Sequence, residues 1–177
     1  MKNSKEEGYL HDKLQDKAVL IDPGEGERLA MAGGSCVFKV TSAISDNQLG
    51  VYEMTLQPQT IGARLHYHRY MDETFVVTKG LLTIQTAERK IEAREGAVVY
   101  VPRYTPHGFS NQSDEETRLL LLFNPCQQRE GFFYGLYEIL GEQPVDAGKF
   151  LMLYQKYDSI PVDPSDMLPS VSGRKTQ

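Results

Sequence analysis

The sequence predicts one all-β domain, built as a sandwich, barrel or jelly roll, with two helices behind it. Three observations predict this class. The chain has 177 residues, close to the size of one domain with short appendages. Residues 18–124 form short β-type segments separated by turn residues, a spacing typical of sandwiches and barrels. After residue 124 the apolar residues change to helical spacing.

The first expected strands lie in the N-terminal part of this region. Residues 18–21 are an apolar run that stops at the turn signal Asp-Pro-Gly of residues 22–24. Residues 36–40 are rich in apolar and β-branched side chains. Residues 51–56 alternate, with Tyr, Met and Leu on one face and Glu and Thr on the other. We therefore expect three strands here.

Four more strands are expected between residues 73 and 123. Residues 73–78 and 81–86 flank Lys79-Gly80, which predicts a hairpin turn between them. Residues 97–101 and 118–123 are almost continuously apolar. Such runs are suited to strands that are covered on both faces.

Two helices are expected within residues 125–157, packed on or beside the barrel. Asp146 is a candidate N-cap for the second helix. The predicted organisation is a polar arm at 1–17, the barrel at 18–124, the helices at 125–157 and an irregular tail at 158–177. The apolar residues at helical spacing are Phe132, Phe133, Leu136, Ile139 and Leu140, then Phe150, Leu153, Tyr154 and Tyr157.

Composition and charge exclude several classes of partner. The 19 Lys and Arg residues against 24 Asp and Glu residues give a formal net charge of −5, and no long basic run occurs. Neither nucleic acid nor a membrane surface is therefore an expected partner. Cys36 and Cys126 form no CxxC pair, which argues against a disulfide scaffold and a cysteine zinc module. The charged start lacks an apolar segment, so we expect a cytoplasmic protein.

Three of the four histidines fall in one pattern with a glutamate. His66 and His68 are two residues apart, so on a strand both side chains point to the same face and can converge on one ion. Glu73 has the wrong parity for an unbroken strand, so residues 69–72 must bend the chain and return it inward. His107 arrives on a separate strand after a turn bounded by prolines. Three imidazoles and one carboxylate suit one divalent transition metal: Fe, Mn, Ni, Co, Cu or Zn.

This pattern resembles the two motifs of the cupin superfamily. The first runs from Gly62 through His66, His68 and Glu73 to Gly80, and the second runs over residues 96–111. The resemblance covers about residues 37–123 and implies a cupin β-barrel of the jelly-roll type, with His66, His68, Glu73 and His107 as metal ligands. The stretch from His66 to Gly80, together with the paired C-terminal helices, makes the chain similar to single-domain, type-2 cupins of the quercetin dioxygenase-like kind. The family likeness also suggests a homodimer.

Five residues are candidates for chemistry or for a substrate pocket. Glu73 either doubles as the catalytic base or serves as a ligand only. Arg64 shares parity with His66, so it either anchors an anionic substrate or is solvated before the strand begins. Phe75 and Phe109 share parity with Glu73 and His107, and either line the pocket or belong to the core. Tyr104 stands where the second motif has its inner glycine, and alters a turn at the barrel mouth.

The function expected from this site is a small-molecule oxidoreductase of the dioxygenase-like type, binding a small-molecule substrate. A six-coordinate ion with four protein ligands keeps two positions open for substrate and O₂. Two other functions stay open: a non-oxidative isomerase or decarboxylase acting on a small acid or sugar, and a non-catalytic ligand-binding cupin. A structural zinc closed at four ligands is a further alternative, although a barrel of this size has ample core without it.

Overall fold

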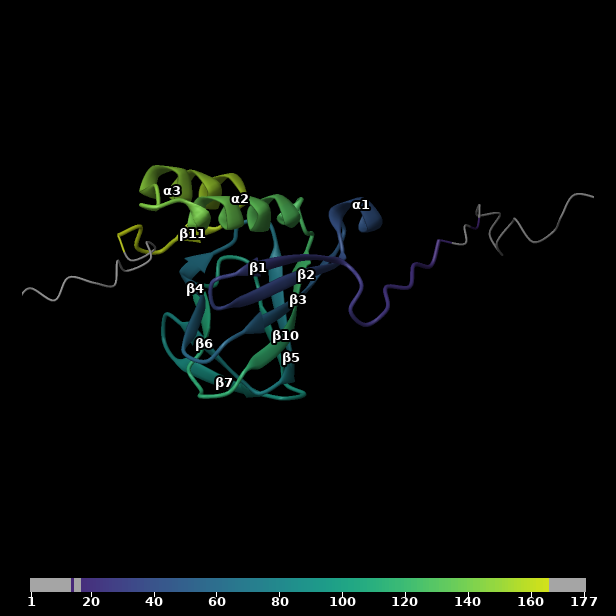
Figure 1. Ribbon diagram of the computed structural model, residues 1–177, viewed down its shortest axis with the longest axis horizontal. Coiled ribbons are helices and arrows are strands. Elements are labelled where there is room, and N and C mark those ends of the chain that lie inside the picture. Colours follow the sequence, from purple (N-terminus) through teal and green to yellow (C-terminus); the bar gives the residue numbers. More distant parts are fainter. Residues whose placement is uncertain (1–13, 15–16, 166–177) are drawn as a thin grey trace, which may run out of the picture.

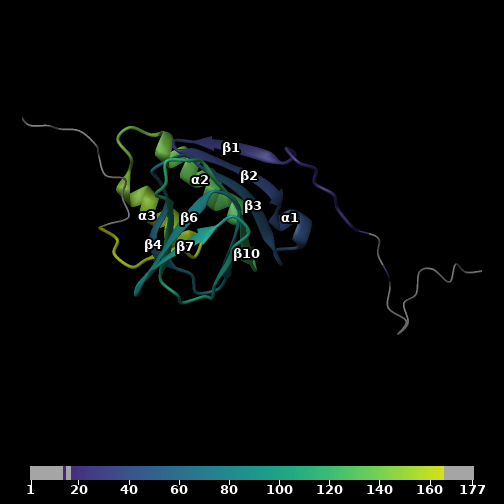
Figure 2. The same ribbon diagram turned by 90° about the horizontal axis from the view of Figure 1, so that it is seen from below.

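The computed structural model describes residues 14 and 17–165, whose strands form two antiparallel sheets (Figure 1). The six-stranded sheet has the order β1 (Glu27–Met31), β2 (Gly34–Val40), β3 (Gly50–Leu56), β10 (Thr117–Asn124), β5 (Asp72–Lys79) and β8 (Val98–Val101). The five-stranded sheet has the order β11 (Ile160–Pro161), β4 (Thr60–Tyr67), β9 (His107–Asn111), β6 (Leu81–Thr86) and β7 (Lys90–Arg94). The sheets curve around a common interior (Figure 2). The expected all-β barrel is confirmed.

The two expected helices are also confirmed. They are α2 (Arg129–Gly141) and α3 (Ala147–Lys156), and a single turn, α1 (Ser42–Ser45), lies between β2 and β3. Figure 1 shows α2 and α3 lying together across one end of the barrel. Asp146 caps α3, because its carboxylate accepts from the backbone N–H groups of Gly148 and Lys149. Phe132 and Phe133 of α2 and Phe150 and Tyr154 of α3 join the core of the barrel. Neither of these helices, nor any other in the described ranges, has the length and apolarity that a membrane crossing needs.

The strand expected at residues 18–21 does not form. Val19 and Leu20 are exposed, and these residues belong to no sheet. The first strand is instead β1, which pairs with β2 in the register Leu29 to Cys36. The turn before β2 contains Gly33 at φ +89°, a conformation that glycine adopts without strain. Residues 27–31 form the first strand because the turn at Gly33 pairs them with β2. The apolar run at residues 18–21 has no partner strand in the described part of the chain, so it gains little from an extended conformation.

The predicted hairpin at Lys79-Gly80 is confirmed. Gly80 has φ +79° and joins β5 to β6. The expectation that both faces of residues 97–101 are covered is wrong. These residues contain β8, in which Val98 is 63% and Tyr100 is 59% exposed. In the described residues β8 pairs only with β5, so it is a sheet edge with one face toward the core. In the central strand β10 one face is fully buried, whereas the other is half-buried at Leu120 and Leu122 and exposed at Arg118 and Asn124.

The chain returns to the barrel after the helices. Asp158 and Ser159 are buried, and β11 pairs with the end of β4 at Tyr67 and His66. Little regular structure is expected there, and β11 has two residues. The amino-acid composition of residues 158–177 does not predict that Asp158 and Ser159 are buried against the barrel. The expected arm at 1–17 lies outside the described residues except for Leu14 and Lys17, and 166–177 lie outside them as well.

Candidate metal centre

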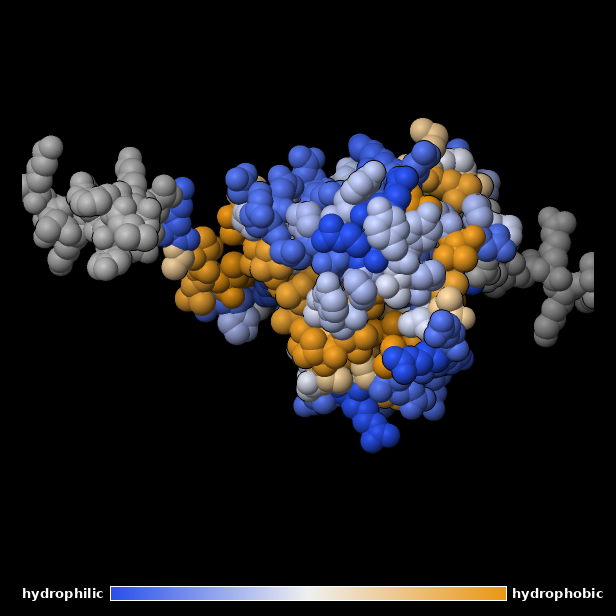
Figure 3. Space-filling model, turned by 180° about the vertical axis from the view of Figure 1, so that it is seen from behind, coloured by the Kyte–Doolittle hydropathy of each residue, from blue (hydrophilic) through white to orange (hydrophobic). Residues whose placement is uncertain are grey.

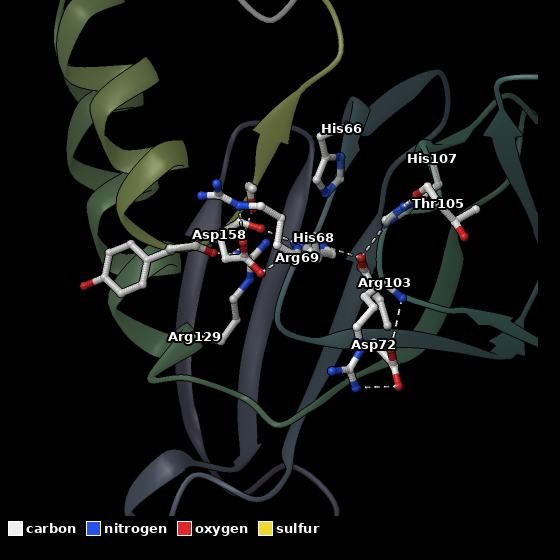
Figure 4. Close-up of polar contacts among 12 residues, drawn as sticks. His66, His68, Arg69, Asp72, Arg103, Thr105, His107, Arg129 and Asp158 are labelled. Atoms are coloured by element: carbon white, nitrogen blue, oxygen red, sulfur yellow. Dashed lines mark hydrogen bonds and ion pairs between the residues drawn. The ribbon is translucent and has the colours of Figure 1, made fainter.

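The structure brings the four predicted ligands together at the end of the barrel beneath the helices. Ligand atoms of His66, His68, Glu73 and His107 all lie within 4.8 Å of one another, and each residue is at most 2% exposed. Figure 4 shows the three imidazoles turned toward one region between the sheets. Such a compact, buried group of neutral and anionic donors fits a divalent metal ion.

Two sheets contribute to this cluster. His66 lies near the end of β4 and pairs with His107 at the start of β9, whereas Glu73 lies on β5 in the opposite sheet. His68 follows the last residue of β4. The bend expected over residues 69–72 is present, because β5 begins at Asp72 and turns Glu73 inward. The short segment from His66 to Glu73 therefore passes from one sheet to the other and places ligands on both sides of the barrel interior.

Backbone carbonyls orient all three imidazoles. Each Nδ1 lies within hydrogen-bond distance of a carbonyl oxygen, which can only accept, so each Nδ1 carries the donated proton. The remaining nitrogens, the Nε2 atoms, are thereby directed to the cluster, where those of His68 and His107 lie 3.0 and 2.6 Å from Glu73 Oε2. The three carbonyls belong to Arg64 (2.8 Å from His66), Asp158 (2.5 Å from His68) and Thr105 (2.8 Å from His107).

The charges within the cluster also favour a cation. Burial alone would raise the pKa of Glu73, but His107 and His68 hold it well below its usual value. Burial, together with His107 and His68, lowers the pKa of His66, which keeps this imidazole neutral. Burial opposes protonation of His107, yet Glu73 raises its pKa above the ordinary value. The surroundings of Glu73 thus favour a positive charge beside it, which a bound cation would supply.

Asp158 is a site residue that sequence reasoning missed. Its carbonyl holds His68, and its carboxylate accepts from the backbone N–H groups of Arg69 at 2.9 Å and Tyr70 at 2.7 Å. It adopts φ +54°, a left-handed conformation that Asp tolerates better than most residues. An Asp just after the last turn of a predicted helix was the available signal. Asp158 thus contacts His68 through its carbonyl and the two residues that follow His68 through its carboxylate (Figure 4).

A cavity of about 100 Å³ adjoins the cluster. His66 and Glu73 form part of its wall, and the helices contribute Arg129, Tyr154 and several apolar residues. The aromatic and large aliphatic side chains of the wall are Met31, Met54, Leu56, Ile61, Phe109, Leu121, Phe123, Phe132, Phe133, Leu136 and Leu140. The helices are thus part of the cavity, and they do more than cover the core.

Of the four expected pocket residues, Phe109 lines this cavity and three do not. Phe75 is fully buried in the core, where its ring contacts those of His107 and Phe109. Tyr104 is 63% exposed, and its φ of +64° explains why a glycine fits this position. Arg64 is half-buried outside the wall. The register of β4 shifts between Ala63 and His66, so parity with His66 does not carry Arg64 into the cavity.

Chelation of the metal is expected to leave the protein folded. The core is continuous between barrel and helices and is made of apolar side chains, so we expect folding not to depend on the ion. The far-ultraviolet circular dichroism should be retained with a chelator, and thermal unfolding should stay cooperative with a lowered midpoint. Loss of the folded state on chelation would instead identify a structural zinc site.

Comparison with known proteins agrees with this architecture. Residues 52–123 match the model of the Cupin domain family. The chain is 28% identical over 134 residues to quercetin 2,3-dioxygenase of Bacillus subtilis (strain 168), which is 73% of this chain and 37% of the relative. The chain thus spans well under half the length of that relative.

Solved structures show the same fold. KdgF from Halomonas sp. superposes with a TM-score of 0.56 at 15% identity, over 64% of this chain and 98% of that one. A predicted oxalate decarboxylase from Thermotoga maritima gives 0.53 at 18% identity, over 60% and 98%. The family match, the two facing sheets and the buried His-His-Glu-His cluster together identify the barrel of this chain as a cupin domain.

Proposed function

We propose that this cupin is a metal-dependent enzyme of the dioxygenase-like type, acting on a small and largely apolar substrate. The observation that carries the proposal is the cavity, whose mainly apolar and aromatic wall includes His66 and Glu73 of the four-residue ligand cluster. His66, His68, Glu73 and His107 would hold one divalent transition metal among Fe, Mn, Ni, Co, Cu and Zn. When bound, that ion supplies a Lewis acid and an electron conduit.

The residues of the chain supply the remaining requirements. Glu73 is the one carboxylate among the described residues of the cavity wall, so we assign it the acceptance of a proton from an acidic substrate hydroxyl or C–H group. Phe109 and Phe123 offer ring surface to a planar substrate, and the helix residues Phe132 and Phe133 shield the chamber from water. Exclusion of water strengthens the electrostatic contacts inside the site.

Two alternatives to the dioxygenase-like reaction were open from the sequence. A sugar or a small polar acid needs a hydrogen-bond partner for each hydroxyl, and burial without one costs about 1–3 kcal/mol each. The wall offers mainly apolar side chains, so it favours an apolar substrate over an isomerase or decarboxylase substrate of that polar kind. A non-catalytic binding protein would share the same cavity, and only turnover separates it from an enzyme.

The similarity to quercetin 2,3-dioxygenase supports oxygen chemistry, and the cavity refines the substrate class. A volume of about 100 Å³ suits a compact molecule better than a three-ring flavonol. We therefore expect small β-diketones to be consumed faster than flavonols.

Oxygen uptake tests this proposal. Samples loaded separately with Fe, Mn, Ni or Co would be mixed with a panel of small diketones and flavonols, and dissolved oxygen would be followed with an electrode. Uptake is expected with at least one metal, and the isosteric variant Glu73→Gln should abolish it. Tight binding of a panel member without oxygen uptake would favour the non-catalytic binding role and contradict the proposal.

The homodimer and the cytoplasmic location stay predictions. Val98 and Tyr100 on the β8 edge are exposed, and Figure 3 shows hydrophobic residues gathered on one face of the molecule. An unprotected edge of this kind is one that a second copy can cover.

A further inference from the structure

Arg129 is a buried cation in the roof of the metal-site cavity. It is the first residue of α2 and is 3% exposed. Its guanidinium carbon lies 3.9 Å from the ring centroid of Phe132 and 4.6 Å from that of Phe123. These cation–π contacts offset part of the desolvation of the charge, but a ring does not accept the hydrogen bonds of a guanidinium as an oxygen does.

The hydrogen bonds of Arg129 are incomplete. Its Nη1 donates to the carbonyl of Tyr157 and to the hydroxyl of Ser159, both at 2.9 Å. Its Nε is buried without a partner, and no carboxylate in the described ranges forms an ion pair with it. A buried charge is normally paired, because leaving it unpaired costs several kcal/mol. Arg129 therefore presents an unmet requirement for an anionic acceptor.

The position of this unmet requirement is informative. Ser35 Oγ is the other buried side-chain atom without a hydrogen-bond partner in the described part of the chain. Ser35 and Arg129 both line the cavity that also contains His66 and Glu73. Arg129 is the one Lys or Arg among the wall residues. The two unpartnered polar atoms thus belong to residues that line one mainly apolar chamber, which is where a ligand would supply partners.

We propose that Arg129 determines substrate specificity by anchoring an anionic oxygen, a carboxylate or an enolate, of an otherwise apolar substrate in the metal-site cavity. The inference rests on the proposed function in that it places the substrate in this chamber. An anionic oxygen accepts from Nε, and Ser35 offers a second donor on the wall. Arg129 thereby takes the role that parity had suggested for Arg64.

A purely structural role for Arg129 makes a different prediction. By holding Tyr157 and Ser159, Arg129 also braces the segment whose Asp158 carbonyl orients His68. Loss of that bracing alone would weaken the metal site and would affect charged and neutral ligands equally. The discriminating quantity is therefore the preference for an anion over a neutral molecule of the same shape.

Calorimetric titration of the full-length, metal-loaded protein with benzoate and benzamide, without oxygen, measures this preference. Benzoate is expected to bind at least about tenfold tighter than benzamide. Arg129→Gln should remove the preference, Arg129→Lys should retain part of it, and Arg64→Gln should leave it unchanged. Equal binding of the two probes by the unmodified protein would overturn the inference without relying on any variant.

Two further outcomes would also contradict the anchor. If Arg129→Gln keeps the preference and chelation abolishes it, the metal holds the carboxylate. If Arg129→Gln weakens both probes equally and lowers metal content, the residue is structural. Because the titration needs no turnover, it is independent of the oxygen-uptake test. Tighter binding of benzoate than of benzamide, without oxygen uptake, would support the anchor and contradict the oxidative reaction. Oxygen uptake with equal binding of the two probes would support the oxidative reaction and contradict the anchor.

Discussion

Replacing His107 by alanine is expected to abolish stoichiometric metal binding. The substitution removes one of three imidazoles whose Nδ1 hydrogen bonds direct Nε2 to the cluster, and it leaves Glu73 without its 2.6 Å partner. Affinity should therefore fall by more than the roughly 10–100-fold that loss of an outer hydrogen-bond partner costs a metal site. Elemental analysis of the purified protein after dialysis measures the metal content directly. His66→Ala should behave in the same way.

The matched control for this experiment is His11→Ala. It also removes one histidine, and nothing in its sequence context links it to the motif. Metal content should then equal that of the unmodified protein. The folded state of each variant is checked by circular dichroism, since a buried imidazole also contributes to packing. Unchanged metal content in both His66→Ala and His107→Ala would show that the ion binds elsewhere.

The second large effect is expected for Asp158→Asn. Asn keeps the size of the side chain and tolerates the φ of +54°, but its amide group offers one acceptor oxygen where the carboxylate has two. The backbone N–H groups of Arg69 and Tyr70 both donate to Oδ2, so the amide oxygen can still accept from both, but the negative charge that strengthens these two hydrogen bonds is lost. The amide nitrogen also replaces Oδ1, which accepts from Arg69 Nε. The carbonyl that holds His68 would also be less firmly placed.

We therefore expect Asp158→Asn to lower metal affinity roughly 10–100-fold and to lower the unfolding midpoint. Competition with a fluorescent chelator measures the affinity, and thermal unfolding measures the midpoint. Asp114→Asn is the control, because Asp114 is exposed and its carboxylate accepts from Gln59, which is outside the cluster. An unaltered metal affinity in Asp158→Asn would mean that packing alone orients His68.

The metal cluster could be predicted because its information is local. His66, His68 and Glu73 lie within eight residues, and the alternation of a strand plus one bend determines which way their side chains point. His107 was identified by its proline-bounded turn and by the family resemblance. Parity failed for Arg64, where the register shift between Ala63 and His66 breaks the alternation on which parity depends.

By itself the sequence determined the all-β class, the two helices and the four residues that meet at the cluster. Only the tertiary structure decided what surrounds them. Asp158 lies 90 residues from the His68 that it holds, and Arg129 enters the cavity wall from a helix that composition marks as core cover. The physical reason is that apolar burial drives helices onto the barrel without specifying direction or register. Which polar groups come to face the metal-site cavity is therefore decided by packing.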